Sequence, residues 1–333
     1  MKRTNILFAL LLSTLFLAVS CAVTPDEDSD DGYDHMMKAW MRLNYPSVQP
    51  YGSGGAYILQ MDKGSGPAIK DTAFIRAHYT KRSLDGSISE TNVKELAGQL
   101  GTYSVSSCFD GNTWQLGKGY LPDALEEVIY TMNSGGSASI AVPLSVSEHE
   151  YAIYDAFSIT PEISNYVYDL TIDTVLNDIY AYQESAMRTW FQTHYAISDT
   201  LVEHLYFKKL EEKSGENDSI PEGNSIKVRY IGRLMSGQVF DTNIEDTAKF
   251  YRIWNGSGSY SGLEISFYKK DDSEFEKNNS VVTGFGKAIQ QMNYGETAVT
   301  LFGSKLGYGA AGSNPSIPEY SPLFFWIYIE PEE

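Results

Sequence analysis

The chain has 333 residues, of which 42% are hydrophobic and 13% are aromatic, and this composition excludes a wholly disordered protein. Because a domain usually holds about 150 residues, the length predicts two domains. Asp and Glu number 43 against 25 Lys and Arg, which gives a formal net charge of −18. Such a charge repels phosphate backbones, and no local basic patch offsets it, so we expect no nucleic-acid partner.

Thiol and imidazole groups are scarce in this sequence. The only cysteines are Cys21 and Cys108, which excludes a disulfide framework and a zinc site built from four thiolates. None of the five histidines lies three or four residues from another, the separation that puts two ligands on one helix face. We therefore expect no metal and no cofactor.

The first 20 residues have the pattern of an export signal. Two basic residues follow the initial methionine, and an apolar run then extends over residues 6–19. That run is too short for a typical membrane span. Cys21 follows Ala-Val-Ser, which resembles the lipobox of bacterial lipoproteins, so we expect residues 1–20 to be removed and Cys21 to be lipidated. A plain signal peptide cut near Ser20 is the alternative.

Residues 21–32 form an acidic segment with one Pro and one Gly. Such a composition cannot bury apolar surface, so we predict a solvated tether. The acidic run behind Cys21 resembles the surface-export signal of lipoproteins from the Bacteroides group, and Ala22 does not resemble an inner-membrane retention signal. This resemblance implies an outer-membrane lipoprotein, anchored to the membrane by its lipid, on the periplasmic or cell-surface face.

The remaining sequence contains an internal duplication. Residues 37–45 (MKAWMRLNY) recur at 187–195 (MRTWFQTHY), an offset of 150, and later matching segments keep a similar offset. Each copy therefore consists of one helix followed by one domain. The second copy carries an insertion, which we predict to be a loop over residues 244–280. The predicted units are a leading helix at 33–47, domain 1 at 48–175, a linker helix at 176–197 and domain 2 at 198–333.

The residue pattern also predicts the elements within these units. Apolar residues recur at helical spacing in both leading helices, which must therefore pack on a neighbouring surface. β-branched and aromatic runs separated by turns predict strands, and one short helix interrupts each copy. The result is an α+β fold in which an antiparallel sheet buries one face on a helix. In chain order the predicted segments are strand 73–79, helix 122–132, strand 137–142, strand 226–230, helix 284–292, strand 298–302 and strand 323–329.

One motif is misleading. Residues 307–312 read Gly-Tyr-Gly-Ala-Ala-Gly, which satisfies the dinucleotide-binding pattern G-x-G-x-x-G. That pattern requires a following helix and an acidic residue about 20 positions further on. Here Ser-Asn-Pro-Ser-Ile-Pro follows instead, so these glycines are interpreted as turn formers in a loop. The sequence also lacks a G-x-S-x-G elbow and a P-loop, which excludes the corresponding hydrolases and phosphotransferases.

The first of four ordered blocks contains Tyr230-Ile-Gly232 and Phe240-Asp241, and the second contains Phe285. Over about residues 205–331 the four blocks resemble the FKBP-type peptidyl-prolyl isomerases. The resemblance implies two FKBP-like domains, each an antiparallel sheet curled around a short helix and preceded by an extra helix. Domain 1 resembles a degenerate copy, because Ser89 and Glu90 replace the Phe-Asp pair of the family and Leu125 stands where domain 2 carries Phe285. The four blocks are residues 228–242, 281–292, 306–318 and 323–325.

The resemblance also implies a proline-binding pocket in domain 2. Phe285 would form its floor, where the family usually has Trp. Asp241 would be the family's aspartate, and the Tyr308 hydroxyl and the Val282 backbone N–H would face the substrate. The implied site residues are Tyr230, Phe240, Asp241, Val281, Val282, Phe285, Tyr308, Ile317 and Phe325.

The chain departs from the family pattern at three places. Ser313 replaces the loop histidine, and Glu319 replaces a second proline. The long insertion obscures the remaining aromatic wall, for which Ile265 and Phe267 are the candidates. The resemblance therefore implies the fold more strongly than it implies catalytic strength.

A pocket of this kind suits X-Pro isomerisation. Twisting the amide bond costs about 18–20 kcal/mol because it destroys resonance, and no proton has to move. An apolar, aromatic-lined site binds the twisted, less charge-separated amide better than either planar form, which is differential binding of the transition state. We therefore predict a peptidyl-prolyl cis-trans isomerase or folding assistant that acts on proline-containing polypeptides.

Two other interpretations remain open. The duplicated domain would serve as a non-catalytic binding or structural lipoprotein if the insertion formed a recognition loop, since a fold does not entail an activity. The protein would be a chaperone if its extra helices gripped clients. The sequence leaves its oligomeric state open.

Overall fold

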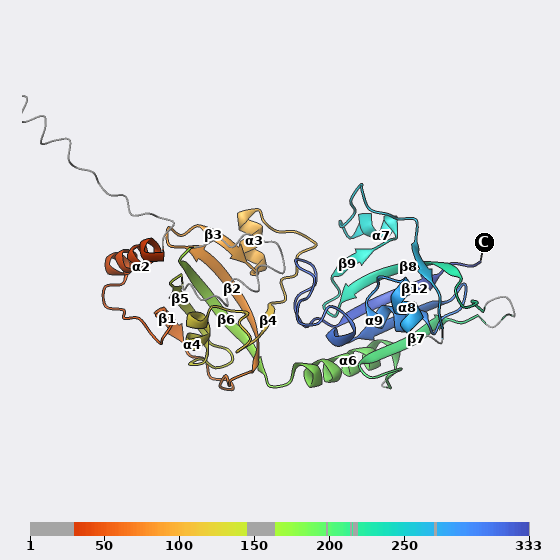
Figure 1. The fold of residues 1–333 in the computed structure, drawn as a ribbon, viewed down its shortest axis with the longest axis horizontal. Coiled ribbons are helices and arrows are strands. Elements are labelled where there is room, and N and C mark those ends of the chain that lie inside the picture. The colour runs from red at the N-terminus through yellow and green to blue at the C-terminus, as the bar shows by residue number, and fades with distance from the viewer. Residues whose placement is uncertain are drawn as a thin grey trace, which may run out of the picture.

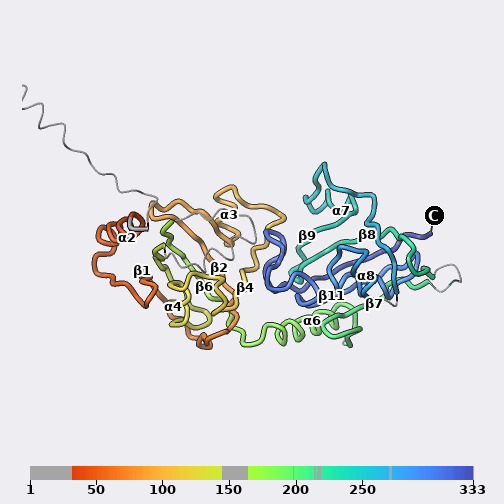
Figure 2. Tube along the Cα trace, viewed as in Figure 1, coloured from red at the N-terminus to blue at the C-terminus, as the bar shows by residue number. Residues whose placement is uncertain are grey.

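The computed structural model describes residues 30–144 and 164–332, apart from residues 198, 214, 216–218 and 270–271. The described chain forms two domains in sequence, each built on an antiparallel sheet (Figures 1 and 2). The predicted signal peptide and the lipidation site Cys21 lie outside the described residues. None of the described helices is both long enough and apolar enough to cross a bilayer.

Domain 1 is a six-stranded sheet in the order β1-β5-β6-β2-β3, with β4 paired to the other end of β2. Helix α4 covers one face, where Leu125, Val128 and Ile129 are fully buried among strand residues. The elements are α2 (Asp30–Asn44), β1 (Tyr57–Asp62), β2 (Phe74–Ser83), β3 (Ile88–Thr91), α3 (Lys94–Leu100), β4 (Asn112–Gln115), α4 (Asp123–Ile129), β5 (Ser137–Val142) and β6 (Tyr166–Leu176).

Domain 2 is a second six-stranded sheet in the order β7-β11-β12-β8-β10, with β9 paired to β8. Helix α9 buries Phe285, Ala288 and Ile289 against this sheet. The elements are α6 (Ile179–Tyr195), β7 (Leu205–Glu211), β8 (Ser225–Leu234), β9 (Val239–Thr242), α7 (Glu245–Phe250), β10 (Leu263–Ser266), α8 (Asp272–Asn278), α9 (Thr283–Ile289), β11 (Thr297–Phe302), a 3₁₀ turn (Ser304–Leu306) and β12 (Leu323–Ile329).

The two sheets have the same topology, strand for strand. Strands β7, β11, β12 and β8 occupy the places of β1, β5, β6 and β2, while β9 and β10 occupy those of β3 and β4. The register agrees as well, because Gly232 pairs with Asp241 on β9 as Lys81 pairs with Glu90 on β3. The predicted α+β class, with two antiparallel sheets, is therefore confirmed.

The two extra helices pack on the sheets of the domains that they precede. In α2, Met37 and Met41 are buried against Ala141 of β5 and Val167 of β6. The longer α6 buries Met187 and Phe191 against β7, β11 and β12. Where the sequence predicts helices at 33–47 and 176–197, the helices span Asp30–Asn44 and Ile179–Tyr195.

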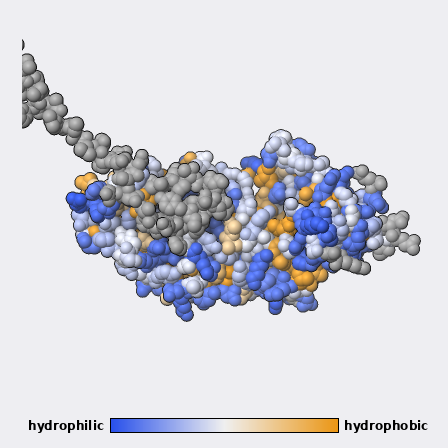
Figure 3. Space-filling model, in the orientation of Figure 1, coloured by the Kyte–Doolittle hydropathy of each residue, from blue (hydrophilic) through white to orange (hydrophobic). Residues whose placement is uncertain are grey.

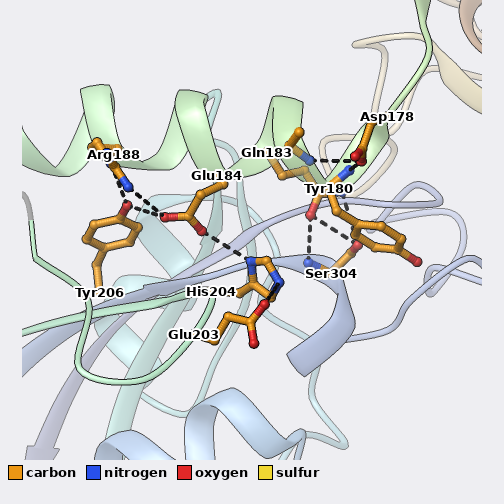
Figure 4. A network of polar contacts seen from close by, with 10 residues as sticks. Asp178, Tyr180, Gln183, Glu184, Arg188, Glu203, His204, Tyr206 and Ser304 are labelled. Carbon is orange, nitrogen blue, oxygen red and sulfur yellow. Dashed lines mark hydrogen bonds and ion pairs between the residues drawn. The ribbon is translucent and has the colours of Figure 1, made fainter.

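Buried polar contacts fix α6 on domain 2 (Figure 4). Gln183 donates through Nε2 to the Tyr320 carbonyl at 2.7 Å and to Ser304 Oγ at 3.0 Å, and its Oε1 accepts from the Ser304 N–H at 3.0 Å. The next residue, Glu184, accepts from the Tyr206 hydroxyl at 2.5 Å and lies 3.2 Å from His204 Nδ1. Side chains of α6 therefore hold both the start of domain 2 and its 303–320 loop.

The insertion at 244–280 contains regular structure, and its description as a loop was wrong. It holds α7, β10 and α8, and β10 pairs with β8 as β4 pairs with β2 in domain 1. Phe275 on α8 is buried beside Gly286 of α9. The helices are only six and seven residues long, so they show too little periodicity to be recognised from sequence.

The domains also contact one another. Phe74 of β2 packs edge to face on Tyr320, with ring centroids 5.1 Å apart, and Ile179 at the start of α6 joins the same cluster. The Tyr320 hydroxyl donates to Gln115 of β4 at 3.4 Å. The two domains therefore meet through the 303–320 loop and the junction of β6 and α6.

On the face seen in Figure 3 hydrophilic residues predominate, and hydrophobic patches gather over domain 2.

Candidate active site

Four aromatic rings from different elements of domain 2 meet in one cluster. Tyr230 comes from β8, Phe240 from β9, Phe285 from α9 and Phe325 from β12. Phe325 is central, with ring centroids 4.9 Å from Phe285, 5.6 Å from Phe240 and 6.1 Å from Tyr230. The sheet and its helix therefore bring together four residues that are up to 95 positions apart in the sequence.

Gly232 makes this arrangement possible, although the sequence interpretation gave it no place in the site. A Cβ atom at Gly232 would lie 2.6 Å from the Phe240 ring and 2.9 Å from the Phe325 ring, so no larger residue fits. In domain 1 the equivalent position is Lys81, whose Nζ lies 3.9 Å from the centroid of the Tyr166 ring. Gly232 lies in the first of the four blocks that resemble the family, but its closeness to the two rings is seen only in the structure.

Asp241 and Tyr230 form the polar edge of the cluster. The Tyr230 hydroxyl donates to Asp241 Oδ2 at 2.7 Å. Burial, followed by the nearby Asp241 charge, raises the pKa of Tyr230 well above its usual value. The same two causes raise the pKa of Tyr308, whose side chain is 42% exposed. Both hydroxyls therefore remain protonated hydrogen-bond donors beside one carboxylate.

The start of α9 and the 303–320 loop position the other predicted residues. Val282 caps α9, Val281 precedes it, and both half-buried side chains pack against the domain 2 core. Ile317 is buried in the same core, and its carbonyl and N–H pair with Ser313 at 2.7 and 2.9 Å. Among the described residues, no protein group accepts from the Val282 N–H or the Tyr308 hydroxyl, so both are available to a ligand.

A cavity of about 440 Å³ adjoins the cluster. Its lining includes Tyr230, Phe240 and Asp241 together with Ile253 and Tyr260 from the insertion. The insertion thus contributes to the site, but through residues other than the candidates Ile265 and Phe267. Those two side chains are 1% exposed and belong to the domain 2 core.

The predicted floor of the pocket is covered in this structure. Phe285 is 3% exposed, Phe325 is 6% exposed, and neither lines the cavity. Cys108, from domain 1, packs against the apolar core of domain 2, to which both rings belong. Of the nine predicted residues, Tyr230, Phe240 and Asp241 line the cavity, whereas Phe285, Ile317 and Phe325 are buried.

Domain 1 has a different set of residues at the equivalent place. Tyr79 donates to Glu90 much as Tyr230 donates to Asp241, but Ser89 stands where domain 2 has Phe240. The Trp114 ring lies 5.1 Å from the Tyr79 ring and fills the neighbouring space. Leu125 is fully buried in the core. The polar pair is therefore retained in domain 1, whereas the aromatic walls are not.

Comparisons with known proteins agree with this division. Residues 216–330 match the family model of the FKBP-type peptidyl-prolyl cis-trans isomerases. A probable FKBP-type peptidyl-prolyl cis-trans isomerase of Haemophilus influenzae is 27% identical over 118 residues, which make up 35% of this chain and 39% of that protein. FK506-binding protein 1A of Aspergillus fumigatus is 28% identical over 122 residues, which make up 37% of this chain and 89% of that protein.

The matched region thus spans about two fifths of the Haemophilus protein and about nine tenths of the Aspergillus protein. Among solved structures, the three FKBP domains of wheat FKBP73 align with 84% of this chain and 95% of that chain, at 18% identity and a TM-score of 0.29. The C-terminal domain is therefore similar to the FKBP-type peptidyl-prolyl cis-trans isomerases over residues 216–330.

Proposed function

We propose that domain 2 catalyses cis-trans isomerisation of X-Pro bonds in polypeptides. The observation that carries the proposal is the meeting of the Tyr230, Phe240, Phe285 and Phe325 rings beside the Tyr230–Asp241 hydrogen bond. The family match of residues 216–330 covers all of these residues. Domain 1 lacks the aromatic walls. In this proposal it recruits client polypeptides or braces domain 2, and it does not catalyse isomerisation.

The chemistry follows from the surroundings of the rings. A planar amide gains resonance stabilisation that is lost when the bond twists, and the twisted amide is less charge-separated. Aromatic walls stabilise it relative to the planar forms, because water solvates the planar dipole better than the rings do. The Val282 N–H and the Tyr308 hydroxyl hold the substrate's carbonyls while the bond turns. No group on the protein has to gain or lose a proton.

A proline-isomerisation assay tests the proposal. The assay uses a tetrapeptide substrate and a soluble chain, defined as residues 21–333 with Cys21→Ser. We expect catalysis, and we expect Phe240→Ala to lower kcat/KM about tenfold or more, which corresponds to about 1.4 kcal/mol. The matched control is Phe250→Ala, since Phe250 lies on the nearby α7 and is 78% exposed. Rates that stay at the uncatalysed value with the soluble chain added would rule the activity out.

A non-catalytic binding protein is the second candidate. Its favouring observation is the low exposure of Phe285, because a covered floor limits access to the rings. Titration with an FK506-like macrolide or a proline peptide separates the two functions, with Trp254 fluorescence as the readout. Trp254 is suitable because it is 46% exposed and its neighbours Ile253 and Asn255 line the cavity. A bound ligand without rate enhancement favours this second candidate.

We further propose that the protein is exported and anchored to the outer membrane by a lipid on Cys21, on the periplasmic or cell-surface face. The support is the sequence of residues 1–32, with its basic start, apolar run and acidic tether. Incorporation of labelled palmitate into the full chain tests the anchor. Cys21→Ala should abolish the label and Cys108→Ala should retain it, and a label that persists in Cys21→Ala contradicts the anchor.

A further inference from the structure

A loop of domain 1 lies against the candidate site of domain 2. Residues 103–109, here called the crossing loop, follow α3 and precede β4. Gln238, in the β8–β9 turn, donates through Nε2 to the Ser107 carbonyl at 3.1 Å and to the Val105 carbonyl at 3.4 Å. The Cys108 N–H donates to the Pro315 carbonyl at 3.0 Å. Groups from two separate parts of domain 2 therefore hold the crossing loop.

Side chains of the crossing loop reach the site itself. Ser106 lines the cavity together with Tyr230, Phe240 and Asp241. Cys108 packs against the apolar cluster that contains Phe285, and burial raises the pKa of its thiol to about 11. Through Ser106 the crossing loop therefore contributes to the wall of the cavity, and through Cys108 it packs on the core of domain 2.

The crossing loop has an internal framework that keeps its shape. The rings of Tyr103 and Phe109 stack at its base, with centroids 5.5 Å apart and an interplanar angle of 9°. Ser104 and Ser106 share a hydrogen bond between their hydroxyls at 2.8 Å. His78 of β2 lies 3.1 Å from the Phe109 carbonyl through Nε2. These contacts give the crossing loop a defined shape on domain 1.

The chemistry of these contacts is that of a polypeptide ligand. Domain 2 binds the crossing loop through main-chain carbonyl and N–H groups, and residues 103–109 carry no charged side chain. A client chain near a proline offers the same main-chain groups. The loop and a client therefore compete for the same face of domain 2.

We propose that the crossing loop is a built-in lid on the proline site of domain 2, which a client chain has to displace. This inference rests on the proposed isomerase function. The apparent affinity for a client is the intrinsic affinity reduced by the fraction of molecules in which the lid is open. Variants that release the lid therefore gain activity, which distinguishes a lid from a wall that assists binding.

The experiment uses the soluble chain, in which Cys108 is the only thiol. Gln238→Ala removes both hydrogen bonds from the β8–β9 turn to the lid, and Ser236→Ala, an exposed position in the same turn, is the matched control. The first readout is the rate of Cys108 alkylation by iodoacetamide, with and without a proline-bearing peptide. The second is kcat/KM for isomerisation of the same peptide.

We expect Gln238→Ala to raise both the alkylation rate and kcat/KM about tenfold, a factor that corresponds to 1.4 kcal/mol. The peptide should accelerate alkylation of the parent chain, and Ser236→Ala should change neither readout. A second variant, Cys108→Asp, places a charge against the apolar cluster and should raise kcat/KM in the same way.

Two outcomes overturn the lid. One is a kcat/KM that falls or stays constant in both Gln238→Ala and Cys108→Asp while the parent is active. The other is a Cys108 alkylation rate that neither Gln238→Ala nor the peptide changes. If the parent and both variants show no isomerase activity, but the peptide and Gln238→Ala still accelerate alkylation, then the isomerase function fails while the lid over a peptide-binding site stands.

Discussion

The Tyr230 hydroxyl donates to Asp241 Oδ2 at 2.7 Å across the β8–β9 pair, and Tyr79 makes the same contact with Glu90 across β2 and β3 of domain 1. Each bond fixes a carboxylate at the same position of equivalent sheets. In domain 2 Phe240 stands beside the pair, whereas domain 1 has Ser89 at that position. The hydrogen bond therefore belongs to the fold of both domains, whereas the rings around it belong to the function that we propose for domain 2 alone.

The bond between Tyr230 and Asp241 gives a first prediction. Tyr230→Phe keeps the ring but removes the donor, so one net hydrogen bond of about 1 kcal/mol is lost. We expect the free energy of unfolding to fall by about 1 kcal/mol, and kcat/KM for isomerisation to fall about fivefold because Asp241 is no longer held beside the rings. Tyr79→Phe, the equivalent change in domain 1, should leave kcat/KM unchanged. An equal loss of activity in both variants would show that domain 1 takes part in catalysis.

Gly232 gives a second prediction. A methyl group there would meet the Phe240 ring at 2.6 Å, and overpacking of this kind costs about 1–3 kcal/mol. Gly232→Ala should therefore displace Phe240, weaken macrolide or peptide binding, and lower the free energy of unfolding of domain 2. Gly98→Ala is the control, because a Cβ there meets nothing within 4 Å and Gly98 lies inside helix α3. It should stabilise domain 1 by about 0.5–1 kcal/mol.

The structure brings together four rings that the resemblance assigns to one pocket, and their role in a site stays a prediction. Tyr230, Phe240, Phe285 and Phe325 each sit in a block whose order resembles one family, and order along the chain fixes their places in the fold. The part played by Gly232 was not predicted, because it depends on the distance between two rings on neighbouring strands. A single sequence does not contain information on that distance.

The contacts between the two domains could not be predicted from the sequence, for another reason. The crossing loop and Gln238 are more than 120 residues apart, and no periodic pattern relates them. The insertion was wrongly described as a loop because its helices are shorter than eight residues. Periodic sequence patterns indicate helices and strands that extend over many residues. A single long-range contact or a very short helix leaves no such pattern.

Glu319 gives a third prediction, on pH. This residue of domain 2 accepts from Asn112 of domain 1 at 3.4 Å and from Asn314 at 3.4 Å. Burial, with a smaller effect from the Glu90 charge, raises its pKa above the ordinary value of 4.5. Its stabilising contribution is therefore fully present below pH 4.5 and is lost as the pH rises through the higher folded-state pKa.

Glu319→Gln mimics the protonated form, so it should raise the free energy of unfolding at pH 7 relative to the parent. The advantage should disappear near pH 4, where the parent is protonated in both states. Urea unfolding at the two pH values measures the difference. An advantage of equal size at both values would mean that the charge of Glu319 is not its cause. Glu332→Gln, an exposed change near the C-terminus, is the control.

Gln183 gives the last prediction, because one buried amide joins α6 to the loop that carries Tyr308 and Ile317. Gln183→Leu would leave the Tyr320 carbonyl and the Ser304 N–H without their partner. Each unpaired buried group costs about 1–3 kcal/mol, so we expect domain 2 to lose about 3 kcal/mol in its free energy of unfolding. Gln192→Ala is the matched control, since Gln192 is an exposed glutamine on the same helix.

The position of Gln183 also predicts which function changes first. The Tyr320 carbonyl and Ser304 lie at the two ends of the loop that holds Tyr308, so loosening them should raise KM for the peptide at temperatures where Gln183→Leu is still folded. Hydrogen exchange of residues 303–320 measures the loosening directly. Faster exchange confined to that loop and to α6 agrees with the prediction, whereas uniform acceleration over domain 2 would indicate a loss of global stability alone.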